Sequence, residues 1–85
     1  MTFQQLAATL GDKIEYEEGV VQSATFEAND PATPEGRKRT RWRDAKRAES
    51  KLIAYKDVLQ VVLDELKLPD TPDVDSYMAT RPATM

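Results

Sequence analysis

The segment PEGRKRTRWRDAKR, residues 34–47, concentrates the side chains of this chain that could bind an anion. It holds seven arginines and lysines and one tryptophan in fourteen positions. Guanidinium groups bind phosphates and carboxylates through paired hydrogen bonds, and an exposed tryptophan can stack on a base. A nucleic-acid or nucleotide site here would use Arg37, Lys38, Arg39, Arg41, Arg43, Lys46 and Arg47. The alternative is that these residues match acidic side chains of the same protein.

The charge distribution favours the internal match. Residues 1–36, 37–56 and 57–85 carry net charges of −6, +7 and −4, so the chain as a whole carries −3. An antiparallel fold of the first segment on the second brings acids close to bases, and it predicts the pairs Glu27–Lys38, Glu18–Arg47 and Glu15–Lys51. Such exposed pairs contribute only about 0–1 kcal/mol each, so they select the register more than they stabilise the fold.

Residue types that support catalysis are scarce. The chain has no histidine and no cysteine, which excludes imidazole and thiolate chemistry at any site. Ser23 and Ser50 have no base to activate them. Asp70, Asp73 and Asp75 lack the glycine and the final glutamate of a calcium-binding loop. We therefore expect no enzyme, no metal site and no cofactor.

The elements that position the basic segment are best defined in the second half of the chain. Thr33 suits the cap of a helix, Pro34 its first position, and Pro69 stops it, so the sequence predicts a helix over 34–68. Apolar residues recur through it at steps of three and four: Ala45, Ala48, Leu52, Tyr55, Leu59, Val62 and Leu66. This spacing is typical of a coiled-coil seam.

The first half allows two interpretations. Apolar residues at steps of four and three, interrupted only by Glu17, favour a helix over 2–28. The alternative for residues 13–27 is a β-hairpin that turns at Gly19, because Val20, Val21 and Phe26 prefer strands. We favour the helix.

Together these segments predict an all-α fold. Residues 1–68 form an antiparallel two-helix hairpin resembling a coiled coil, with a turn at 29–33. Residues 69–85 carry three prolines and are expected to form an extended or disordered tail. Tyr77 and Met78 are the large apolar residues by which this tail could dock on the hairpin or on a neighbour.

The segment VLQVVLDELKL, residues 58–68, is apolar around an arc of roughly 220°, wider than one partner helix covers. Part of it must meet either the C-terminal segment or another subunit, and we expect another subunit. The predicted interface of this homo-oligomer consists of Val58, Leu59, Val61, Val62, Leu63 and Leu66. No stretch is long and apolar enough for a membrane-spanning helix, so no membrane partner is expected.

The pattern A..AESKLIAYKDVLQVVLDEL, after an acidic helix and a short turn, resembles small helical-hairpin proteins encoded by tailed bacteriophages. The resemblance covers about residues 14–67 and implies a virion accessory protein or one that targets a host or defence protein. The first ten residues do not resemble a signal peptide. The expected location is therefore the cytoplasm, that of the host if the protein is phage-encoded, or the virion. The expected function is non-enzymatic protein–protein assembly, with nucleic-acid or nucleotide binding as the alternative.

Overall fold

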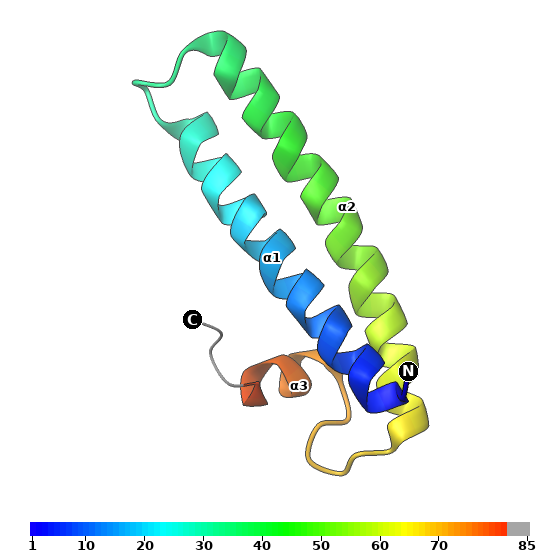
Figure 1. Cartoon of the computed structure of the whole chain (residues 1–85). Helices are drawn as coiled ribbons and strands as arrows, with labels where there is room; N and C mark the ends of the chain where they lie inside the picture. The colour runs from blue at the N-terminus through cyan, green and yellow to red at the C-terminus, as the bar shows by residue number, and fades with distance from the viewer. Residues whose placement is uncertain (82–85) are drawn as a thin grey trace.

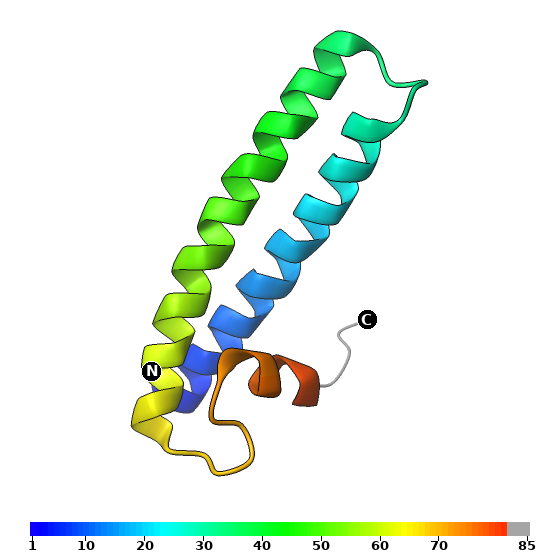
Figure 2. The same cartoon turned by 180° about the vertical axis from the view of Figure 1, so that it is seen from behind.

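A computed structural model describes residues 1–81 and places them in three helices (Figure 1). Helix α1 spans Phe3–Asn29, α2 spans Glu35–Leu66 and α3 spans Val74–Thr80. The two long helices run antiparallel beside each other, and α3 lies across the end where α1 begins and α2 ends, as the view from behind also shows (Figure 2). The prediction of an all-α fold with two long packed helices is confirmed.

Helix α1 begins with a reciprocal capping arrangement. The Thr2 hydroxyl accepts a hydrogen bond from the Gln5 N–H, and the Gln5 side chain accepts one from the Thr2 N–H. Two of the unpaired N–H groups at the helix start are thereby satisfied. Residues 13–27 lie within α1, so the β-hairpin alternative is wrong. The strand-forming preferences of Val20 and Val21 are outweighed by an apolar stripe of helical period that packs on α2.

A short turn joins the two long helices. The Asp30 carboxylate accepts a hydrogen bond from the Ala32 N–H, which tightens the chain reversal. Pro34 precedes α2 as its cap without a side-chain hydrogen bond, whereas the sequence suggested Thr33 for that position. Helix α2 ends at Leu66, two residues before the predicted end, and Lys67 follows in the left-handed conformation with φ of 54°.

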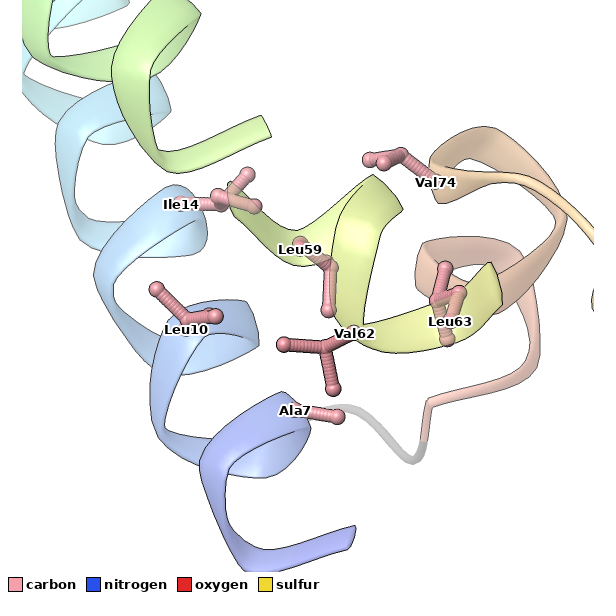
Figure 3. Close-up of a cluster of buried hydrophobic side chains, with 7 residues drawn as sticks. All are labelled: Ala7, Leu10, Ile14, Leu59, Val62, Leu63 and Val74. Atoms are coloured by element: carbon pink, nitrogen blue, oxygen red, sulfur yellow. The ribbon is translucent and has the colours of Figure 1, made fainter. Parts of the chain in front are cut away.

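The core is unevenly distributed along the hairpin. Large buried side chains gather at the end that contacts α3, where Ala7, Leu10 and Ile14 of α1 face Leu59 and Val62 of α2 (Figure 3). Toward the turn, the buried residues of the interface are alanines: Ala24, Ala28, Ala45 and Ala48. Burial of apolar surface is therefore greatest near α3 and least near the turn.

The C-terminal segment differs from the prediction of an extended or disordered tail. Residues 74–80 form α3, and Val74, Tyr77 and Met78 pack on the hairpin core. The Asp73 carboxylate caps the helix by accepting a hydrogen bond from the Ser76 N–H at 2.8 Å. This cap and the apolar contacts offset the effect of the flanking prolines. The last four residues of the predicted tail, 82–85, lie outside the described part of the chain.

Candidate functional site

The six residues of the predicted oligomer interface separate into two groups. Leu59, Val62 and Leu63 are buried in the core of the single subunit, and Leu66 is partly buried against it. In this fold they are not available to a second subunit. Val58 and Val61 are exposed, with 48% and 62% of their surface accessible. The predicted interface is therefore reduced to the side of α2 that carries these two valines.

Helix α3 accounts for the burial of Leu63. Gln60 fixes the start of α3, since its amide donates to the Pro72 carbonyl at 3.0 Å and accepts from the Val74 N–H at 3.2 Å. Val74 belongs to the same apolar cluster as Leu63. The wide apolar arc of α2 is thus divided among α1, α3 and solvent. Helix α3 covers one flank, and the opposite flank remains open.

Arg81 attaches the end of α3 to α1. Its guanidinium donates to Glu15 at 3.1 Å and to the Ala8 carbonyl at 3.0 Å, and it also pairs with Asp12. The group lies on the helix surface at Gly11, where a Cβ would stand 2.0 Å from Arg81 Nη1. Burial alone lowers the pKa of Arg81, but the hydrogen bonds to Asp12 and Glu15 outweigh it and raise the pKa, so the group stays charged.

One part of the basic segment faces α1 and is neutralised there. Arg37 donates to Glu27 at 2.9 Å, and Arg41 lies 3.4 Å from the same carboxylate. Arg41 also donates to Asp44 at 3.0 Å and to the Ser23 hydroxyl at 3.3 Å. Further ion pairs within α2 join Lys38 to Glu35 and Lys46 to Glu49, both at 3.6 Å. These basic residues therefore pair with acidic side chains of the same protein.

The other part of the basic segment lies outside the contacts with α1. Arg39, Arg43 and Arg47 follow one another at intervals of four residues, which places them along one side of the helix. All three are exposed, and none makes an ion pair or hydrogen bond within residues 1–81. They form the outward arginine row of α2.

Trp42, the tryptophan of the basic segment, is partly exposed. Its side chain is 43% exposed, although the apolar seam of α2 continues backward toward it. The seam near the turn is lined by alanines, which leave no deep pocket for an indole ring. Trp42 therefore lies at the border of the helix interface, outside the buried core.

The ion pairs between α1 and α2 are displaced from the predicted ones. Lys51 pairs with Glu17 instead of Glu15, and Arg41 reaches Glu27 in place of Lys38. These two pairs are shifted by two and three residues, somewhat less than one helical turn, whereas the partner of Glu18 is nine residues from the predicted one. Glu18 pairs with Lys56 at 3.9 Å instead of Arg47. Arg47 consequently has no partner within residues 1–81.

An open cleft of about 690 Å³ lies between the long helices on the side of Arg47. Gly19, Ser23 and Ala48 keep its floor low, and charged side chains surround it: Glu15, Glu17, Arg41, Asp44, Arg47 and Lys51. Three of these side chains are acidic and three are basic, so the charges lining the cleft balance. It is a shallow groove that borders the open flank of α2.

Within residues 1–81, no cluster of three or more acidic side chains is arranged to hold a metal ion. In the same part of the chain, none of the helices combines the length and apolar character needed to cross a membrane.

Comparisons with known proteins give no match: no family model, no curated protein and no solved structure is significantly similar to the chain. The candidate site is therefore defined by its own geometry.

Sequence reasoning missed Gly11, Gln60, Val74 and Arg81, which together hold α3 in place. The sequence did contain a signal for the helix that carries Val74 and Arg81. Val74, Tyr77, Met78 and Arg81 are spaced as one face of a helix, and Asp73 stands at the position of its cap.

Proposed function

We propose that the chain is a non-enzymatic protein–protein interaction protein that acts as an assembly of identical helical hairpins. The observation that supports this function is the open flank of α2. Val58 and Val61 are about half exposed or more in the last third of the longest helix, near the small side chain of Ala54. Single exposed apolar residues are ordinary, but a stripe of them on a regular helix is typical of a protein contact.

The small size of the chain is a second reason to propose self-association. A chain of 85 residues has a thin core, and the alanine-lined half of this hairpin buries little apolar surface. Chains of this size commonly gain stability from self-association when disulfides and metals are lacking. The resemblance to phage-encoded hairpin proteins implies a virion or a host protein as the setting of such an assembly.

The test is the molecular mass as a function of concentration, measured by sedimentation equilibrium. We expect a reversible transition from monomer to oligomer in the wild-type protein, and Val61→Glu should shift it to much higher concentration. Ile53→Glu is the matched control, because Ile53 is 65% exposed but lies about 80° around the helix from Val61. Circular dichroism should show that both variants remain helical. A wild-type protein that stays monomeric up to about 1 mM would contradict the proposal.

A second candidate function is the binding of nucleic acid through the outward arginine row. What supports it is that Arg39, Arg43 and Arg47 are exposed and unpaired within the described residues. Binding of duplex DNA should then weaken steeply as salt rises, and Arg43→Ala should reduce the slope by about one phosphate contact. Lys67→Ala removes one charge elsewhere and is the control. If a fluorescent duplex shows no binding at low salt, this function is excluded.

A further inference from the structure

We propose that the open flank of α2 binds a second copy of this chain in antiparallel orientation, so that Arg47 of each copy pairs with Glu65 of the other. The inference rests on the proposed assembly function and specifies its partner and geometry. The contact surface is called the outer stripe. It consists of Arg47, Lys51, Ala54, Val58, Val61 and Glu65.

The outer stripe has the spacing of a coiled-coil seam. Its residues follow one another at alternating steps of four and three, so that they fall within an arc of about 80° on the helix. It is distinct from the seam that packs on α1, which contains Leu59 and Val62. Helix α2 therefore carries two seams, of which one is filled within the subunit and the other is open.

Helix α3 does not obstruct the outer stripe. It contacts α2 through Gln60 and Leu63, and each of these lies two residues beyond a valine of the stripe. Two residues correspond to about 200° of rotation, so α3 and the stripe lie on nearly opposite sides of α2.

Charge sets the orientation of the second copy. The stripe is basic at Arg47 and Lys51 and acidic at Glu65, with Ala54 and Val58 between them. A parallel pair would place Arg47 beside Arg47 and Glu65 beside Glu65. An antiparallel pair with its twofold axis between Ala54 and Val58 places the opposite charges together at both ends.

The layers of this antiparallel pair fit by size. Ala54 of one copy meets Val58 of the other around the axis. In the next layer, Val61 meets Lys51, whose aliphatic stem can cover the valine while its ammonium group stays in water. Arg47 and Glu65 close the stripe. Neither of these two has a partner within residues 1–81, so pairing them breaks no existing contact.

The stripe measures about 27 Å from Arg47 to Glu65 at 1.5 Å per residue. Only three of its side chains are apolar, so the interface belongs to the small and reversible class. We expect a dimer with Kd in the micromolar range. Because the contact is isologous and uses the same stripe on both copies, it closes at two subunits and does not extend into filaments.

The experiment is a charge exchange followed by sedimentation equilibrium. Arg47→Glu and Glu65→Arg should each raise the Kd of dimerisation about tenfold or more, because each homodimer then has like charges at both ends. Mixing the two variants should restore the dimer, since the heterodimer again has opposite charges at both ends. The double variant R47E/E65R should also dimerise with a Kd within about threefold of the wild type.

Arg39→Glu is the matched control. It reverses the same charge on the same helix, but in this register it faces no α2 residue of the second copy. It should leave the Kd of dimerisation within about threefold of the wild type. Circular dichroism and thermal unfolding of each variant at low concentration should match the wild type, because Arg47 and Glu65 have no partner in the part of the chain that the structure describes.

The outcomes separate the two proposals. A wild-type chain that remains monomeric overturns both the assembly function and this geometry. A wild-type oligomer whose charge variants are not rescued by mixing overturns the antiparallel pairing alone and leaves the assembly function standing.

Discussion

The guanidinium of Arg81 occupies the space in which any side chain at position 11 would lie. Glycine in the interior of a helix ordinarily costs about 1 kcal/mol relative to alanine. At Gly11 this cost is offset by close approach, because the backbone allows Arg81 to reach Asp12, Glu15 and the Ala8 carbonyl together.

Gly11 and Gly19, both in α1, make a matched pair for testing whether the close approach of Arg81 requires a glycine. A Cβ at Gly19 meets nothing within 4 Å, so Gly19→Ala should raise the free energy of unfolding by about 0.5–1 kcal/mol. Gly11→Ala should lower it, since the new methyl group displaces Arg81. Urea unfolding followed by circular dichroism measures both.

The double variant identifies the cause. In an Arg81→Ala background there is no guanidinium to displace, so Gly11→Ala should become stabilising, as at Gly19. If Gly11→Ala remains destabilising in that background, its effect does not come from Arg81.

Asp73 gives the docking of α3 a dependence on pH. The backbone N–H of Ser76 and then the Ser76 side chain stabilise the carboxylate and lower the pKa of Asp73. A group with a lowered pKa in the folded state contributes stability above its unfolded pKa, near 4, and loses it as pH falls through the folded value. Asp73→Asn retains the capping geometry but does not titrate there. The measurement is hydrogen exchange of the Tyr77 amide between about pH 5 and 2, corrected for the intrinsic exchange rate. We expect the protection of this amide to depend less on pH in Asp73→Asn than in the wild type.

At the scale of the elements, the end of α2 carries local strain. Lys67 adopts φ of 54°, directly after its N–H has donated the last helical hydrogen bond, to the Leu63 carbonyl at 3.0 Å. Glycine takes this conformation without the Cβ conflict of lysine.

Lys67→Gly should therefore raise the free energy of unfolding by roughly 0.5–1 kcal/mol. Lys67→Ala removes the same charge and keeps the Cβ, so it should stay close to the wild type. A thermal or urea unfolding curve distinguishes them, and equal behaviour of the two variants would count against strain at this residue.

The two long helices were predictable because cap residues, prolines and apolar spacing agree over many turns, and no tertiary contact was needed to recognise them. Helix α3 was not predicted, because its seven residues are too few to be stable alone and Pro69 and Pro72 precede it. Its apolar residues have helical spacing, but its formation depends on contacts to Gln60 and the core, which come from distant parts of the sequence.

The candidate site was predictable to a similar degree. The excess of apolar surface on α2 pointed to an additional neighbour, and within the subunit that neighbour is α3, which removes Leu63 from the predicted interface. The partners of Glu17 and Glu27 differ from the predicted ones by amounts that long side chains can span, so a register derived from the turn alone leaves them undetermined.

At the scale of the whole molecule, stability is concentrated where three helices meet. Leu59 is fully buried there, with 0% of its surface exposed, whereas Val61 two residues later faces solvent. Leu59→Ala should cost about 2–5 kcal/mol, a large share of the total expected for a chain of this size.

Val61→Ala is the contrasting variant. In the dilute monomer it should change the free energy of unfolding by less than about 0.5 kcal/mol, and its effect should appear instead as weaker self-association. Urea unfolding at low concentration, together with sedimentation at high concentration, measures both effects. A large loss of stability in the dilute Val61→Ala monomer would mean that its side chain serves the fold itself.

Trp42 is the only tryptophan in the chain, and it lies on the alanine-lined half of the hairpin, far along α2 from the Leu59 cluster. Its fluorescence therefore reports on the tip of the molecule, whereas the far-ultraviolet dichroism averages over all three helices. If the tip frays first on heating, the emission spectrum will change at a lower temperature than the ellipticity. The native optical probe of this protein thus measures local opening of the hairpin, and coincidence of the two melting curves would indicate that the whole chain unfolds in one step.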